Sequence, residues 1–217
     1  MDADTAIGGA GDRFPSTRFS LLEAVSAGGA ITADAMEQVA ALYWKPVYRF
    51  VRWKFRQSNE DAKDLTQSFF ASTIERDFFQ RFDPARGSFR TYVRMAVERF
   101  AANEYAAGNR LKRGGGVAFE PIDEQAAAGE SPEELFEREW RRQLFTLALE
   151  DLRAECERAA KPVQWAVFEA YDLAEGDRPS YAELGARHGV AISQITNYLA
   201  WARGRLRALV EDRRVWS

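Results

Sequence analysis

A helix predicted from about Ala191 carries the side chains of this chain that are best suited to specific chemistry. Hydroxyl and amide groups can hydrogen-bond base edges in the major groove of DNA, and Gln or Asn can pair bidentately with adenine. One face of the helix is apolar at helical spacing, through Ile192, Ile195, Leu199, Ala202 and Leu206. The opposite face, at the N-terminal end, offers the short polar residues Ser193, Gln194, Thr196 and Asn197. We therefore expect a base-reading surface here.

The residues just before this helix indicate how it is positioned. Ser180 can cap a preceding short helix, and Glu183 three residues later completes a capping box. Gly189 then supplies the left-handed residue that a tight turn between two helices requires. Together these features predict a helix-turn-helix over 180–207, with Arg203, Arg205 and Arg207 suited to phosphates. The alternative interpretation is a plain helical hairpin with a solvated polar face.

A second basic segment lies in the first half of the chain. Ser88 can cap a helix of about twenty residues in which Phe89, Tyr92 and further apolar residues face inward. The stretch from Arg90 to Arg113 contains six basic residues and only two acidic ones, whereas the stretch 117–139 contains eight acidic residues and one Arg. Two basic segments that flank an acidic one favour two separate contacts with nucleic acid. The alternative is ordinary unevenness of surface charge.

An acidic helix precedes the second basic segment. Ser58 to Asp61 form a capping signal, and the helix is predicted to run to about residue 76. Its core face holds Leu65, Phe69, Phe70 and Ile74, while its other side carries Asp61, Asp64 and Gln67, with Lys63 and Thr66 nearby.

The chain as a whole is predicted to be all-α, because no segment shows sustained period-two alternation. Glycine-rich and linker-like stretches divide it into a disordered N-terminus (1–18), a first helical domain (19–113), a flexible acidic linker (114–130) and a second helical domain (131–213). In the first domain, a helix is predicted over roughly residues 33–56, with an apolar stripe that runs from Val39 to Val51. The second domain opens at Ser131-Pro132 with a strong helix start and a capping box, and an apolar face continues along this helix from Leu135 to Leu147. Another helix begins at Pro162.

Composition excludes several classes of protein. With one Cys and one His, the chain has no internal disulfide and too few soft ligands for a zinc site. We expect no metal, no cofactor and no enzymatic activity, because no His, Cys or glycine-rich phosphate loop supports the polar clusters. No apolar run approaches the length of a membrane span, and the N-terminus does not resemble a signal peptide, so we expect a cytoplasmic protein without membrane contact.

The order and spacing of four motifs resemble those of bacterial RNA polymerase sigma factors of the extracytoplasmic-function group, within the sigma-70 family. YWKPVYRFVR, EDAKDLTQSFF and RGSFRTYVRMAVERFAANE resemble sigma region two, and SYAELGARHGVAISQITNYLAWARGRLR resembles region four. The resemblance covers roughly residues 19–210. It implies a factor that binds core polymerase and directs initiation at promoters by recognising −10 and −35 elements.

The resemblance also implies roles for individual residues. Docking on the β′ clamp helices would involve Asp61, Asp64, Leu65, Gln67 and Phe70. Opening and binding of the −10 element would involve Arg86, Arg90, Arg94, Arg99, Asn103, Arg110, Lys112 and Arg113. Reading of the −35 element would involve Arg187, Ser193, Gln194, Thr196, Asn197, Tyr198 and Arg203. The β flap of the polymerase and an anti-sigma factor are further implied partners.

One residue departs from the family pattern. Lys63 stands between Asp61 and Asp64, where the family commonly has an acid, and a cation there weakens docking on a basic partner. Some members of the group are controlled by a Ser/Thr kinase, so phosphorylation of Thr66 could restore the negative charge. The alternative for Thr66 is an ordinary helix residue, and the alternative for the whole chain is a stand-alone helix-turn-helix regulator.

Overall fold

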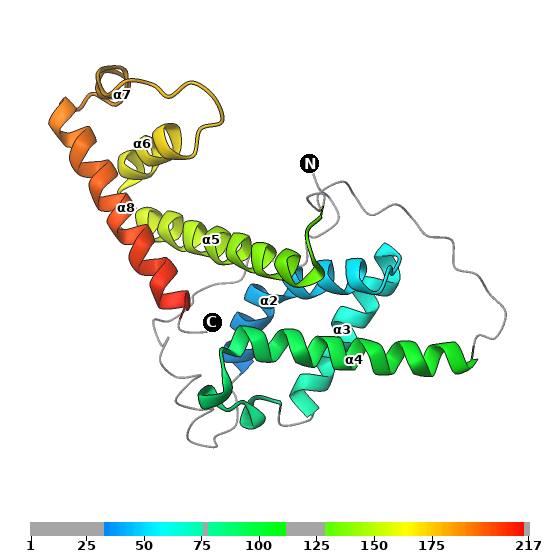
Figure 1. Ribbon diagram of the computed structural model, residues 1–217. Coiled ribbons are helices and arrows are strands. Elements are labelled where there is room, and N and C mark those ends of the chain that lie inside the picture. Colours follow the sequence, from blue (N-terminus) through cyan, green and yellow to red (C-terminus); the bar gives the residue numbers. More distant parts are fainter. Residues whose placement is uncertain (1–32, 76–77, 112–128, 215–217) are drawn as a thin grey trace. The chain divides into compact units, whose positions relative to one another are not determined.

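The computed structural model of the protein describes residues 33–75, 78–111 and 129–214, and these residues are helical with no strand (Figure 1). The predicted all-α fold is therefore confirmed. Two compact units divide the described chain: unit 1 extends to Gln143, and unit 2 runs from Leu144 onwards. Within the described ranges, every helix is too short or too polar to cross a lipid bilayer.

Unit 1 is built on α2 (Ala33–Lys54), α3 (Asn59–Glu75) and α4 (Phe89–Leu111), which all contact one another. The apolar stripe predicted for α2 is buried, from Val39 through Tyr43 to Val51. Ser58 and Ser88 cap α3 and α4 as predicted, because their hydroxyl oxygens accept the backbone N–H of Asp61 and Thr91. Two short 3₁₀ turns, η1 (Phe79–Arg81) and η2 (Pro84–Arg86), lie between α3 and α4.

The first half of α5 (Pro132–Arg158) also belongs to unit 1. Its start is the predicted capping box: Ser131 Oγ accepts the N–H of Glu134, and the Glu134 carboxylate accepts the N–H of Ser131. The sequence predicted a second domain from residue 131, but the packing divides the chain inside α5, between Gln143 and Leu144. Leu111, the last described residue before the predicted linker (114–130), and Gly129, within that linker, therefore both lie in unit 1.

Unit 2 combines the second half of α5 with α6 (Pro162–Asp172), α7 (Tyr181–His188) and α8 (Ile192–Arg214). Its core is one cluster to which each helix contributes, for example Leu152, Phe168, Leu184 and Leu199. Of the apolar positions predicted to face inward on α8, Ile192 is the exception, since 56% of it is exposed. It is the first residue of the helix, where the periodic stripe has not yet reached the core.

The predicted helix-turn-helix is formed by α7 and α8. The Ser180–Glu183 capping box starts α7, and Gly189 ends it with φ 66°. The turn also requires glycine at position 185 of α7, because a Cβ there would lie 2.9 Å from the carbonyl oxygen of Val190. The backbone of the turn therefore packs directly on α7, which fixes where α8 begins.

We expect Gly185→Ala to lower the free energy of unfolding by about 1–3 kcal/mol, because the new methyl group meets backbone rather than a movable side chain. Gly204→Ala is the matched control. This second helical glycine of unit 2 has open space around its Cβ position, so alanine there should stabilise by up to about 1 kcal/mol. Chemical denaturation followed by circular dichroism measures both. Equal effects of the two variants would contradict the close approach at the turn.

Candidate nucleic-acid interface

A cavity of about 550 Å³ lies between α3, the two 3₁₀ turns and α4 in unit 1. Aromatic rings form much of its wall. The ring centroid of Tyr92 lies 4.7 Å from that of Phe78 and 5.5 Å from that of Phe82. The Tyr92 hydroxyl donates a hydrogen bond to the Phe78 carbonyl oxygen at 2.7 Å, which fixes the ring. Burial raises the pKa of the Tyr92 phenol above its ordinary value. The cavity thus has an ordered aromatic wall.

Cationic and amide side chains surround the same cavity. Arg81, Arg86, Arg99 and Asn103 line it and are exposed. Arg86 lies 3.4 Å from Asp83, but 87% of its side chain is accessible. Arg81 and Arg99 form no ion pair within the described residues. This side of α4 therefore presents unneutralised positive charge beside aromatic rings.

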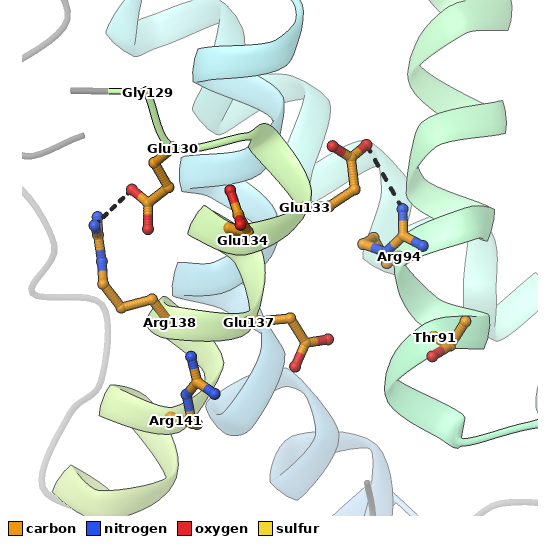
Figure 2. Close-up of a pocket in the computed structure, with 9 residues that line it drawn as sticks. All are labelled: Thr91, Arg94, Gly129, Glu130, Glu133, Glu134, Glu137, Arg138 and Arg141. Atoms are coloured by element: carbon orange, nitrogen blue, oxygen red, sulfur yellow. Dashed lines mark hydrogen bonds and ion pairs between the residues drawn. The ribbon is translucent and has the colours of Figure 1, made fainter. Parts of the chain in front are cut away.

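The opposite side of α4 is different, because acids of α5 cover its arginines. Arg90 Nε lies 2.9 Å from Glu137, and Arg94 lies 3.7 Å from Glu133. Figure 2 shows the Glu133–Arg94 pair across a groove between α4 and the start of α5. The side chains of Arg90 and Arg94 are only 25% and 21% exposed. Arginines that the sequence grouped together thus lie in two different environments.

Glu133 also contacts α2, where Lys54 Nζ lies 2.7 Å from its carboxylate and 2.8 Å from that of Glu98. Burial alone would lower the pKa of Lys54, but these hydrogen bonds outweigh it and raise that pKa. The hydrogen bond from Lys54 lowers the pKa of Glu133. Because the folded-state pKa of Glu133 is depressed, its stabilising contribution is present at neutral pH and is lost as the pH falls through that value.

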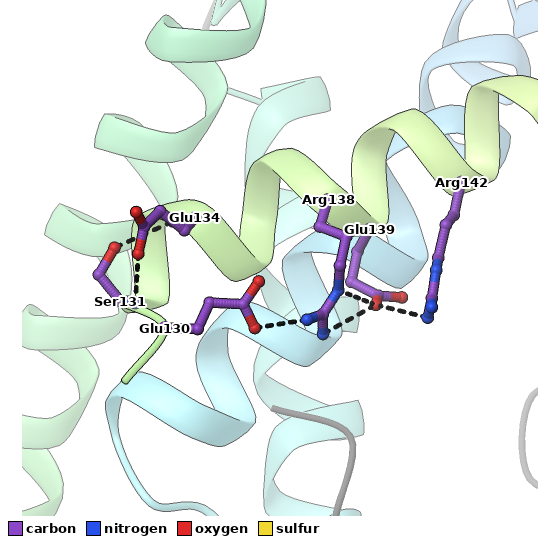
Figure 3. Close-up of polar contacts among 6 residues, drawn as sticks. All are labelled: Glu130, Ser131, Glu134, Arg138, Glu139 and Arg142. Atoms are coloured by element: carbon purple, nitrogen blue, oxygen red, sulfur yellow. Dashed lines mark hydrogen bonds and ion pairs between the residues drawn. The ribbon is translucent and has the colours of Figure 1, made fainter. Parts of the chain in front are cut away.

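A second ion-pair chain runs along α5 itself (Figure 3). The Glu139 carboxylate is almost fully buried and lies 3.5 Å from Arg138 and 3.4 Å from Arg142. Arg138 also binds Glu130, ahead of the helix. A buried carboxylate needs such partners, so this chain of charges ties the segment before α5 to the part of the helix that packs in unit 1.

The residues predicted to bind polymerase lie on α3. Asp61, Asp64 and Gln67 are exposed, and Leu65 is half-buried between them. Phe70 differs from the prediction, because it is 8% exposed and stacks on Trp44 with 5.6 Å between ring centroids. It supports the helix from beneath rather than forming part of its surface.

The prediction that Thr66 could be an accessible phosphorylation site is contradicted by its position. Its side chain is fully buried, and its hydroxyl donates to the Ala62 carbonyl oxygen at 2.7 Å within α3. Lys63 points elsewhere, to within 3.9 Å of Glu60. A kinase cannot reach Thr66 unless α3 detaches from the core, and a phosphate on Thr66 would not lie on the acidic surface beside Lys63.

Unit 2 presents the predicted base-reading residues at the start of α8. Ser193 and Asn197 are exposed. Gln194 is exposed as well, but its side-chain carbonyl oxygen accepts the N–H of Ala191 at 3.0 Å and caps the helix. The Thr196 hydroxyl donates to the Ile192 carbonyl oxygen at 3.4 Å, and Tyr198 packs partly on the core.

The four arginines of unit 2 that the sequence suggested for phosphate contacts fall into two groups. Arg203 forms two hydrogen bonds of 2.8 Å with Asp172 at the end of α6, and Arg205 pairs in the same bidentate way with Glu155 of α5. These two arginines hold α8 on its neighbours. Arg187 and Arg207 are exposed and have no ion-pair partner in the described chain, so they are the freer cations.

Some predicted DNA-binding residues lie outside the described residues, and some residues that line the cavity were not predicted. Lys112 and Arg113 fall outside the described residues, as does the side chain of Arg110. Arg81, Phe78 and Phe82 were missed, although the aromatic run before Asp83-Pro84 was a usable signal. Among the described residues, no group of His, Cys, Asp and Glu could hold a metal ion.

An aromatic and cationic cavity in one helical unit and a helix-turn-helix in the other are features typical of nucleic-acid-binding proteins. The family model described as "ECF sigma factor" matches residues 18–212. The chain therefore belongs to the ECF sigma factor family, whose members act with RNA polymerase and promoter DNA in transcription initiation. No curated protein and no solved structure gives a significant match.

We expect Thr66→Glu to lower the free energy of unfolding by more than about 2 kcal/mol, because it places a carboxylate without a partner in the core of unit 1. Ser68→Glu, on the exposed side of the same helix, should change stability by no more than about 0.5 kcal/mol. Thermal or chemical unfolding distinguishes the two. A Thr66→Glu protein as stable as Ser68→Glu would show that residue 66 is accessible.

Proposed function

We propose that this sigma factor directs initiation at specific promoters, with unit 1 binding the opened −10 element and unit 2 reading the −35 element. The observation that carries the proposal is the aromatic cavity of unit 1 with unneutralised cations beside it. Protein surfaces that bind single-stranded DNA combine rings on which bases stack with positive charge along the backbone. Phe82, Tyr92, Arg81 and Arg99 supply both parts within one site.

The cavity also suits a base that has left the stack. Its volume of about 550 Å³ and its ring-lined wall can hold a flat heterocycle, and the amide of Asn103 can hydrogen-bond the edge of a base. Arg99 and Asn103 lie one helical turn apart on α4, so one side chain can contact a phosphate while the other contacts the base. The cost of unstacking is offset by these contacts.

For the −35 element, we propose that Ser193 and Asn197 make the principal base contacts. Both are exposed in the first turns of α8, the part of a recognition helix that enters the major groove. Gln194 keeps its NH₂ group free, but the hydrogen bond from Ala191 competes with bidentate pairing to adenine. Arg187 and Arg207 are the proposed phosphate contacts, and Arg203 serves first to hold α8 on α6.

We propose that the exposed side of α3 docks on the β′ clamp helices of core polymerase. Asp61 and Asp64 provide charge for a basic partner, and the half-buried Leu65 provides an apolar contact between them. Phe70 acts indirectly by supporting α3 on Trp44. Contact of unit 2 with the β flap, and an anti-sigma factor as inhibitor, remain part of the proposal through family membership alone.

The decisive experiment mixes the purified chain with bacterial core RNA polymerase and mixed genomic DNA. A stable complex and discrete transcripts are expected, with much tighter promoter binding in the presence of polymerase than without it. A stand-alone regulator would instead bind a specific duplex equally well without polymerase. Absence of both a complex and transcripts would overturn the proposal.

Removal of one cation at the cavity should weaken binding to opened promoter DNA. We expect Arg99→Ala to reduce the affinity of the polymerase complex for a forked promoter by about tenfold, since a charge-assisted hydrogen bond to phosphate is lost. The slope of log affinity against log salt should fall by about 0.7, the value for one single-strand phosphate contact.

Arg153→Ala is the matched control, because it removes an exposed arginine of unit 2 on α5, whose ion-pair partner is Glu157 and whose guanidinium lies 5.9 Å from the ring centroid of Trp165. Its affinity and salt dependence should equal those of the unaltered protein. If Arg99→Ala behaved like this control, the cavity side of α4 would not be the strand-binding surface.

A further inference from the structure

Residues 130–143, here termed the docking segment, form a helical face that fits unit 1 closely. Leu135, Phe136 and Trp140 are buried, and the Phe136 ring meets Phe50 of α2 edge-on at 5.8 Å. At its far end, the Gln143 side chain donates a hydrogen bond to the Ala41 carbonyl oxygen at 2.9 Å. The segment is thus anchored by apolar groups along its length.

The rim of this contact is made of carboxylates set against cations. Glu137 faces Arg90 of α4, and Glu133 faces Lys54 of α2. Glu133 also faces Arg94 of α4, as Figure 2 shows. Arg90 is enclosed from a second side, because its guanidinium lies 4.3 Å from the ring centroid of Trp140. Lys54 and Arg94 also pair with Glu98 of α4, whereas the ion-pair partner of Arg90 within the described residues is Glu137. All three cations thus have a carboxylate oxygen where a phosphate oxygen could otherwise bind.

The cations on the two sides of α4 are therefore not equivalent. Arg99 and Arg81, beside the cavity, are exposed and unpaired in the described chain. Arg90 and Arg94 are on the same helix, and Arg94 lies less than two turns before Arg99, yet both are three-quarters covered and neutralised. A DNA strand that extends beyond the cavity along α4 meets carboxylates instead of free arginines.

We propose that the docking segment is a built-in competitor of DNA, whose carboxylates occupy Arg90, Arg94 and Lys54 until the opened promoter strand displaces them. The inference rests on the proposed function, because it takes the strand to lie on α4. The pairs lie at the rim of the contact, where the side chains of Glu133 and Glu137 are 40% and 31% exposed, so a polyanion can replace the carboxylates there. In the free chain, the buried rings of the docking segment keep these carboxylates in place. The free factor consequently binds DNA weakly, and full use of α4 is reserved for the initiation complex.

The test compares Glu133→Gln/Glu137→Gln with the control Glu150→Gln/Glu169→Gln. Both double variants remove two carboxylates, but those of the control are exposed, lie outside the docking segment and form no ion pair within the described residues. The probe is a fluorescent single-stranded oligodeoxynucleotide of mixed sequence, without polymerase. We expect the docking variant to bind about fivefold more tightly than the control, because Arg90, Arg94 and Lys54 each lose an ion pair with the docking segment. Equal affinities would overturn the proposal.

Two further measurements separate competition from changes in net charge or folding. Adding Arg90→Gln and Arg94→Gln to the docking variant should abolish the gain, and a gain that persists would show that the freed cations are not its source. In the unaltered protein, amide hydrogen exchange of residues 130–143 should accelerate when the polymerase complex binds a forked promoter. Unchanged protection there would overturn displacement, and protection of α2 and α3 reports that each variant is folded.

Failure of this inference can be told apart from failure of the proposed function. If the unaltered chain gives transcripts but the docking variant binds the oligodeoxynucleotide no more tightly than the control, the competitor role is wrong and the promoter-binding role stands. A gain in the docking variant without transcripts or a polymerase complex would support the competitor and overturn the sigma role.

Discussion

The stacking of Arg90 on Trp140 brings a charged side chain of α4 and a buried ring of α5 into one contact, and the arrangement of unit 1 depends on it. Trp140 can be buried there because Phe136 and Leu135 extend the same apolar face along α2 and α4. Arg90 in turn orients Glu137 beside it. The buried rings place the start of α5 in unit 1, and the stacked Arg90 with its partner Glu137 makes one side of α4 neutral while the other side presents free arginine.

Local signals in the sequence were sufficient for the helices and their ends. Ser131 with Glu134, and Ser180 with Glu183, are reciprocal capping pairs whose hydrogen bonds involve residues only three apart. The periodic stripe of α2 likewise depends on its own residues, and it is buried as expected. Such features are fixed by short stretches of chain, so they can be predicted without knowledge of what each helix packs against.

Features that depend on the packing partner could not be predicted in this way. Periodicity showed that α5 is amphipathic, but not that its first half packs in unit 1 and its second half in unit 2. The same limit explains Thr66, a polar residue whose hydroxyl is satisfied by its own helix and can therefore be buried. For the candidate interface, helix spacing placed Arg94 and Arg99 together as outward residues, whereas the acids that separate them come from a helix more than thirty residues later.

The carboxylates of the docking segment belong to the same chain as the arginines they cover, and this has a quantitative consequence. An inhibitor on a separate chain dissociates when both proteins are diluted, but a group on the same chain keeps a constant effective concentration. The fraction of molecules with covered arginines is therefore independent of how much of the factor a cell contains. Overproduction would multiply the number of molecules available to polymerase without increasing the share that can bind stray DNA.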